Sequence, residues 1–137
     1  MAVAPPPLGD RCSAGIDLVD IHRVVEMLAR REEQALHKLL TPAEREFVLA
    51  QPVPARHFAA RIAAKEAVYK ALQSLPDARG VGWQEIEVLR SVEGRPSVKL
   101  HGLAAELDRT QGPLIIELSL SHSEMTAGAV AVVGVSR

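Results

Sequence analysis

Hydrophobic residues recur with helical spacing through residues 21–39, where they share one broad face at about 100° per residue. This pattern predicts an amphipathic helix over the range. Asp20 stands directly before it, and an aspartate in that position can accept hydrogen bonds from the free N–H groups of the first helical turn. We therefore expect the helix to begin at Ile21 with Asp20 as its N-cap.

Two further helices are predicted before the middle of the chain. TPAE at 41–44 places threonine before a helix, proline at its first position and glutamate at its third, which is a capping box with the favoured first-turn proline. This helix should end near Ala50. A third helix is predicted over residues 55–74, and it should end before Pro76 because proline disfavours helical backbone in the preceding residue.

The second half of the chain changes from helical spacing to alternation. WQEIEVLR and SVKLHG predict two strands around a GRP turn, LAAELDR predicts one or two helical turns, and PLIIELSLSH with TAGAVAVVGV predicts a closing hairpin. AGIDLV predicts one earlier strand near the N-terminus. Helices that cluster early and strands that cluster late are typical of an α+β fold with an antiparallel sheet, not of a parallel wound sheet.

The length and composition favour one domain with an aliphatic core. The chain has 137 residues, of which 47% are apolar and only 3% aromatic, so one core is expected. Few aromatic residues leave no stacking platform for bases, and with a formal net charge of -1 we expect no nucleic-acid partner. Three consecutive prolines predict a poorly ordered arm over residues 1–11, and the domain should occupy residues 12–137.

Targeting and redox features are few. The N-terminus has no basic region followed by an apolar run, and nowhere do about 18 apolar residues follow one another, so we expect a cytoplasmic protein without a membrane partner. Cys12 is the only cysteine and cannot form an internal disulfide.

Asp17 lies between two branched aliphatic residues in the first predicted strand. A carboxylate so close to a core is costly unless an arginine or a metal compensates it. Alternatively, it caps the following helix, although Asp20 is better placed for that role.

The third predicted helix carries Glu66 and Lys70 four residues apart, on a face shared with Ala59 and Ala63. The small alanines would leave room for a ligand. Alternatively, the pair is an exposed ion pair that stabilises the helix by about 0.2–0.5 kcal/mol. Together with Asp17, however, Glu66 supplies two oxygen ligands on separate elements beside a lysine, which suits a Mg²⁺ ion that keeps waters and bridges phosphates. The chain has no Walker or dinucleotide loop, so side chains must hold the phosphates.

Two other features are candidates for binding. His122 stands in phase with the apolar face of the strand PLIIELSLSH, where it is either structural or in contact with substrate. Arg23, Met27 and Arg30 form a stripe opposite the apolar face of the first helix. Such a stripe is usually a solvated face, but it also fits a partner with an acidic, partly apolar helix.

GID at 15–17, followed by RIAAKEAVYKA at 61–71, resembles the signature of the holo-acyl carrier protein synthase family of 4'-phosphopantetheinyl transferases. The separation of Asp17 and Glu66, 66 - 17 = 49 residues, is similar to the family's. EGRP at 93–96 and SHS at 121–123 resemble two further family motifs. The segment QSLPDARGVGW after Lys70 differs, because the family often has a shorter, more Gly-rich loop there.

The resemblance implies the phosphopantetheinyl transferase fold and a Mg²⁺-dependent transfer of 4'-phosphopantetheine from coenzyme A to a serine of an acyl carrier protein, for fatty acid or polyketide synthesis. It implies that Asp17 and Glu66 hold the metal and that Lys70 contacts the pyrophosphate as the third catalytic residue. By the same resemblance, the nucleotide pocket is lined by Arg61, Lys65, Arg95 and Pro96, with His122 near the 3'-phosphate.

The resemblance also implies partners. Arg23, Met27 and Arg30 fall at positions where the family docks an acidic carrier protein, and short members assemble as homotrimers with sites between subunits. Two other functions are compatible with the residues: a metal-dependent phosphohydrolase acting on a CoA-like nucleotide, and a non-catalytic subunit that only docks carriers.

Overall fold

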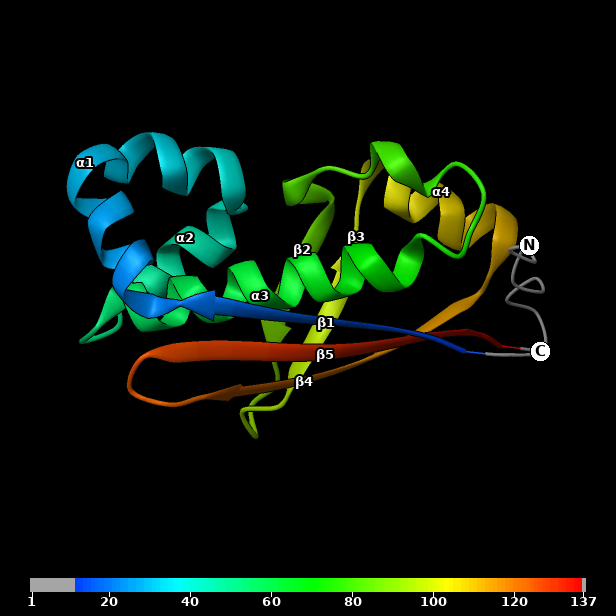
Figure 1. Ribbon diagram of the computed structural model, residues 1–137. Helices are drawn as coiled ribbons and strands as arrows, with labels where there is room; N and C mark the ends of the chain where they lie inside the picture. Colours follow the sequence, from blue (N-terminus) through cyan, green and yellow to red (C-terminus); the bar gives the residue numbers. More distant parts are fainter. Residues whose placement is uncertain (1–11, 137) are drawn as a thin grey trace, which may run out of the picture.

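A long central helix, α3 (Pro54–Leu72), lies along one face of a three-stranded sheet in the computed structural model, which describes residues 12–136 (Figure 1). The sheet is antiparallel with strand order β1-β5-β4, formed by β1 (Ser13–Asp20), β4 (Leu114–His122) and β5 (Thr126–Val135). The predicted α+β class and the closing hairpin are confirmed. The predicted arm at 1–11 lies outside the described residues.

Alanines on α3 allow the helix to pack very closely on the sheet. Ala59, Ala63 and Ala67 are fully buried, and α3 packs on β1 and β5. A Cβ atom added at Gly15 of β1 would lie 2.0 Å from the backbone oxygen of Ala67. The expectation that Ala59 and Ala63 leave room for a ligand is wrong, because both are fully buried and other atoms of the protein occupy that space.

We expect Gly15→Ala to destabilise the protein by about 1–3 kcal/mol or more, because the added methyl group meets rigid backbone and α3 must move off the sheet. Urea unfolding would measure the change. Gly134→Ala on β5 is the matched control, since a Cβ atom there meets nothing nearer than 3.9 Å. Equal losses in the two variants would contradict this explanation.

Two helices, α1 (Ile21–Leu39) and α2 (Pro42–Leu49), cover one end of α3 (Figure 1). Both predicted N-caps are confirmed: Asp20 accepts from His22 N at 2.9 Å, and the Thr41 capping box is present. The predicted first helix is, however, kinked at Arg31, with φ -144° and ψ 39°. Residues 29–34 are all exposed, so no core contact holds the helix straight there.

A second, two-stranded sheet faces α3 from the other side. It pairs β2 (Ile86–Arg90) with β3 (Pro96–Leu100), and β3 lies beside β4. Around it lie the 3₁₀ turns η2 (Ala78–Gly80) and η3 (Trp83–Glu85) and the helix α4 (Gly102–Gln111). The predicted strand WQEIEVLR thus begins as a 3₁₀ turn, and the predicted turns at LAAELDR form a full helix.

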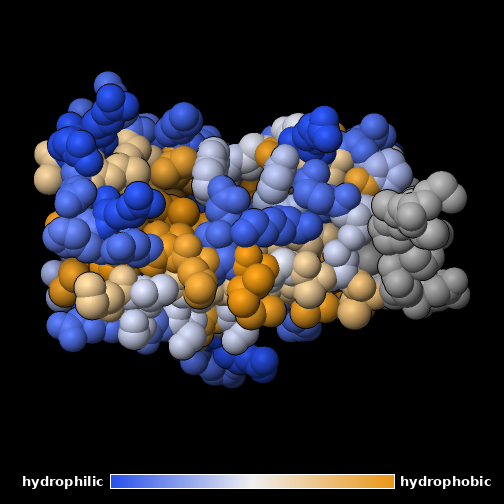
Figure 2. Space-filling view, viewed as in Figure 1, coloured by the Kyte–Doolittle hydropathy of each residue, from blue (hydrophilic) through white to orange (hydrophobic). Residues whose placement is uncertain are grey.

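The face of the three-stranded sheet that points away from α3 is exposed, with hydrophobic side chains on β1 and β5 and the polar Glu117, Ser119 and Ser121 on β4. Ile16 and Leu18 on β1 are 61% and 70% exposed, and Ile115 on β4 and Val130 on β5 are also exposed. Hydrophobic residues gather in a band over the strands of this sheet (Figure 2). No helix among residues 12–136 is long and apolar enough to cross a membrane.

Candidate functional site

Three charged side chains predicted to act together meet between β1 and α3. Lys70 Nζ lies 3.2 Å from Asp17 Oδ1 and donates to the backbone oxygen of Ile16 at 3.0 Å. Asp17 points toward α3 because its register partner on β5 is the buried Ala129. Asp17 therefore does not cap α1, and Lys70 is the cation that compensates its carboxylate.

Glu66 stands one turn before Lys70 on the same helix, and among residues 12–136 its carboxylate takes part in no ion pair. The alternative of a surface Glu66–Lys70 pair is thus not realised, since Lys70 reaches across to β1. Burial raises the pKa of Glu66, the Asp17 carboxylate raises it further, and Lys70 partly offsets both. Glu66 and Asp17 are thus close enough for their charges to repel, which favours an added cation.

The carboxylates of Asp17 and Glu66 fit a magnesium ion better than a metal ion whose ligands all come from the protein. Within the described part of the chain, no group of three or more His, Cys, Asp or Glu side chains could hold a metal. Asp17 and Glu66 supply two hard oxygen ligands. Mg²⁺ is commonly held by one or two carboxylates and completes its shell with water and substrate phosphates, so this donor set suits it.

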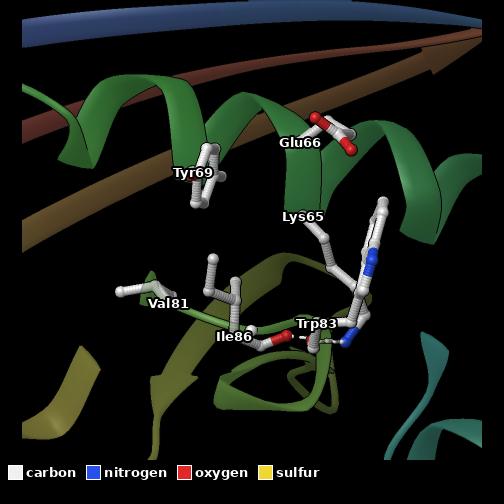
Figure 3. Close-up of a pocket in the computed structure, with 7 residues that line it drawn as sticks. Lys65, Glu66, Tyr69, Val81, Trp83 and Ile86 are labelled. Carbon is white, nitrogen blue, oxygen red and sulfur yellow. Dashed lines mark hydrogen bonds between the residues drawn. The ribbon is translucent and has the colours of Figure 1, made fainter. Parts of the chain in front are cut away.

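A cavity of about 250 Å³ opens beside Glu66 (Figure 3). Lys65, Glu66 and Tyr69 line it from α3, and the opposite wall is formed by Val81, Gly82, Trp83 and Ile86. Apart from Glu66 this lining is largely apolar. The cavity can therefore accept an uncharged arm next to a carboxylate.

Lys65 makes contacts other than those the family resemblance implied. Its side chain is only 1% exposed, and its ammonium pairs with Glu44 Oε1 at 2.7 Å. It also donates to the backbone oxygens of Trp83 and Ile86, each at 2.7 Å (Figure 3). The expectation that Lys65 contacts a nucleotide therefore needs correction: only its alkyl stem faces the cavity, and its charge is used within the protein.

Arg61 lies on α3 one turn before Lys65. It lines a separate groove of about 470 Å³ with Phe47 and Arg90. It is 3% exposed, yet within residues 12–136 its Nε atom has no hydrogen-bond partner. Burial lowers its pKa to about 10, with Glu44 partly opposing and Arg90 adding to the shift. Because Arg61 lines the groove and carries positive charge, it can attract an anion there.

Phe47, Arg90 and His57 complete this cluster, and sequence reasoning missed all three. The guanidinium carbon of Arg61 lies 4.2 Å from the centre of the Phe47 ring, and that of Arg90 lies 5.7 Å from it. The His57 ring meets the edge of Phe47 at 5.7 Å. His57 and Arg61 are four residues apart on one helix, and that spacing was the available signal. Nothing in the sequence pattern indicated Arg90.

His57 responds to this positive environment. Burial lowers its pKa below the ordinary value of about 6.5, and the charges of Arg61, Arg90, His122 and Arg56 lower it further. The predicted substrate contact His122, on β4, is therefore near His57 in the same chain. The neutral imidazole of His57 is the form that the folded protein favours.

We expect the protein to lose stability as the pH falls from 7 through about 6.5, because the unfolded chain then binds a proton at His57 that the folded chain resists. Above that range this contribution to stability is fully present. Urea unfolding at pH 7.5 and 5.5 would measure it. His57→Gln should show a weaker pH dependence, whereas the exposed control His37→Gln should match the wild type.

The remaining predicted residues lie at two places. Arg95, in the β2–β3 turn, and Pro96, the first residue of β3, line a groove of about 480 Å³ that runs to β4 and β5. Arg90 and Gly94 line both this groove and the one at Arg61, so the two adjoin. Arg23, Met27 and Arg30 lie on α1, where both arginines are exposed and Met27 is half-buried.

Comparison with protein families gives one match, to a model described as the 4'-phosphopantetheinyl transferase superfamily, over residues 13–123. The chain is 44% identical over 125 residues to a holo-[acyl-carrier-protein] synthase of Moorella thermoacetica, covering 88% of this chain and 91% of that one. It is 41% identical over 118 residues to the synthase of Syntrophus aciditrophicus, covering 86% and 91%.

Solved structures of similar proteins share the fold. A Chronobacterium ammoniagenes ACPS-CoA complex has 32% sequence identity and a TM-score of 0.77, covering 92% of this chain and 98% of that one. The acyl carrier protein synthase of Mycobacterium tuberculosis has 38% identity and a TM-score of 0.71, covering 90% and 97%.

Proposed function

The chain belongs to the 4'-phosphopantetheinyl transferase superfamily, and we propose that it uses the Asp17, Glu66 and Lys70 cleft for that chemistry. It transfers the 4'-phosphopantetheine arm of coenzyme A to a serine of an apo acyl carrier protein and releases adenosine 3',5'-bisphosphate. The observation that carries the site assignment is the meeting of two carboxylates and a lysine from β1 and α3.

The attacking group belongs to the carrier, so this chain needs no nucleophile of its own. The serine oxygen bonds to the phosphorus of the pantetheine phosphate, and the bond from that phosphorus to the bridging oxygen breaks. Glu66 accepts the serine proton, directly or through a water. Lys70 binds the pyrophosphate and offsets the charge on the departing nucleotide, by its charge or as a proton donor.

Asp17 and Glu66 would hold a Mg²⁺ ion, and when bound it would neutralise charge on the pyrophosphate of coenzyme A. Their donor set fits this ion, as argued above. The half-exposed Lys70 lies beside the same carboxylate, so it is placed to contact the phosphates that a metal would bring there.

The nucleotide end of coenzyme A fits the cluster around Arg61. Arg61 and Arg90 offer positive charge where the 3'-phosphate would lie, and His122 is nearby. Arg95, in the adjoining turn, and Pro96, the first residue of β3, would line the pocket for the rest of the nucleotide. The apolar cavity beside Glu66 would receive the uncharged pantetheine arm.

The exposed stripe on α1 would dock the carrier. Arg23 and Arg30 present two charges around Met27, a combination that suits an acidic helix with some apolar surface. Met27 and Arg30 also line a shallow groove with Arg31 at the helix kink.

Charge reversal at both positions, Arg23→Glu with Arg30→Glu, is expected to raise the KM for an acidic carrier about 10-fold or more with little change in kcat. The reason is that the substitutions alter docking and leave the cleft intact. Steady-state kinetics at low and high salt would measure the effect, which should shrink as salt is added. Arg109→Glu on α4 is the control; an equal rise in KM there would contradict a docking role for α1.

The uncovered sheet face would join three copies of the chain. This face exposes four large hydrophobic side chains, Ile16, Leu18, Ile115 and Val130. Burying them against another copy of the chain would be favourable. In such a homotrimer, sites would lie between subunits. Sedimentation should then give about three times the monomer mass of 14.8 kDa; a monomer would count against this assembly.

The decisive experiment incubates the protein with coenzyme A, Mg²⁺ and a panel of apo carrier proteins, read by intact mass. A transferase adds one phosphopantetheine arm to a carrier. A phosphohydrolase would cleave coenzyme A without a carrier, and a docking subunit would show no Mg²⁺-dependent binding of coenzyme A. Residence in the cytoplasm stays a prediction.

A further inference from the structure

Lys65 is buried in a network that joins four segments of the chain. Its three ammonium protons match three acceptors: Glu44 Oε1 and the backbone oxygens of Trp83 and Ile86. The Glu44 carboxylate in turn accepts from the N–H groups of Thr41 and Val88, each at 2.8 Å. Lys65 thus ties α3 to the start of α2, to η3 and to β2.

The two hydrogen bonds to Trp83 and Ile86 connect the two sides of the cavity beside Glu66. Lys65 and Glu66 are neighbours on α3, while Trp83 and Ile86 form the opposite wall (Figure 3). The Lys65 side chain runs from the helix to the backbone of that wall, so it fixes the distance between the two sides. Among the lining side chains, Lys65 is the one that bonds directly to the backbone of both Trp83 and Ile86.

Stability alone is a weak explanation for such an arrangement. A buried ion pair often stabilises a protein no more than hydrophobic residues of the same size would, because both charges lose their hydration. Burial lowers the pKa of Lys65, and Glu44 offsets this shift. A costly lysine placed next to Glu66 is better explained by what it positions.

We propose that Lys65 is a positioning residue for the transfer reaction, which sets the separation between Glu66 and the Trp83–Ile86 wall and so the width of the cavity that receives the pantetheine arm. This inference rests on the proposed function of the cleft. In this role Lys65 acts through the two backbone oxygens that it holds.

The test replaces Lys65 with methionine and Glu44 with glutamine in one protein, so that neither member of this buried ion pair keeps its charge without the other. Methionine keeps the approximate length of the side chain and cannot donate to Trp83 or Ile86. We expect a native circular dichroism spectrum, a fall in kcat of at least about tenfold, and a KM for the carrier within about twofold of the wild type. Trp83 is the only tryptophan, so a shifted emission maximum would report a moved wall.

Two controls separate positioning from stability. Val48→Ala opens a space in the core away from this cavity, and it should lower the melting temperature with kcat and emission unchanged. Lys38→Met removes an exposed lysine and should change nothing. If the double variant does not fold, Lys65→Gln with Glu44→Gln replaces it. Like methionine, glutamine is one atom shorter than lysine, and its uncharged amide is expected to hold the wall less well.

Native kcat and native Trp83 emission in the folded double variant would overturn the proposal and leave Lys65 a purely structural residue. Failure of the proposed function is distinguishable, because then the wild type itself would add no mass to any carrier. The emission of Trp83 would still show whether Lys65 holds the wall.

Discussion

Replacing Glu66 with alanine is expected to lower transfer at least about 10²–10³-fold while leaving the fold intact. The carboxylate is proposed both to hold the metal and to accept the serine proton, so its loss removes two functions at once. The fold should tolerate the change because Glu66 joins no ion pair among residues 12–136 and its burial already disfavours its charge. Intact mass of the carrier measures transfer, and thermal unfolding measures stability.

Glu66→Gln refines this experiment, because it keeps the shape and removes the charge. Glu106→Ala on α4 is the control, since this exposed glutamate lies outside the cleft and pairs only with Arg109. Near-normal turnover of Glu66→Gln at saturating Mg²⁺ would rule out each of the two proposed roles of Glu66, as the base and as a metal ligand.

Arg61→Met is expected to weaken the binding of coenzyme A about 10- to 100-fold, the range for losing a hydrogen bond to a charged group. It should scarcely affect the binding of dephospho-coenzyme A, which lacks the 3'-phosphate. Within residues 12–136 Arg61 is buried with an orphan Nε atom, and its pKa is lowered to about 10, so the unliganded protein gains little from it. We therefore expect an unchanged or higher melting temperature, a sign of a residue kept for binding.

Calorimetric titration with both nucleotides gives the comparison, and Arg109→Met serves as the control for the loss of an exposed arginine. Equal weakening of both ligands in Arg61→Met would place the 3'-phosphate elsewhere. The neighbouring grooves at Arg90 and Arg95 would then be the next positions to test.

The sequence predicted the elements well where a local signal exists. The capping box at Thr41 and the cap at Asp20 placed two helix starts correctly, because capping depends only on nearby residues. The kink at Arg31 was not predicted, since it follows from the absence of core contacts over residues 29–34. The pairing of β1 with β5 joins the two ends of the described chain, and no local pattern encodes it.

The candidate site was predicted in part for the same reason. Asp17, Glu66 and Lys70 were identified from a motif and do lie together. The motif could not show that Lys65 is buried against Glu44, because that contact depends on how α2 packs on α3. Arg90 and Phe47 join Arg61 from separate elements, so only the folded chain reveals the cluster.

The close contact between Gly15 and Ala67 also bears on how this protein can diverge. Gly15 is required by packing, and the proposed mechanism requires Asp17 for chemistry, yet they stand two residues apart on the same face of β1. A descendant that lost Asp17 would keep its architecture and become an inactive paralogue, whereas one that lost Gly15 would shift α3 and displace Glu66 and Lys70 with it. Among relatives of this chain, a retained Gly15 would therefore indicate the shared fold, and a retained Asp17 would indicate the proposed activity.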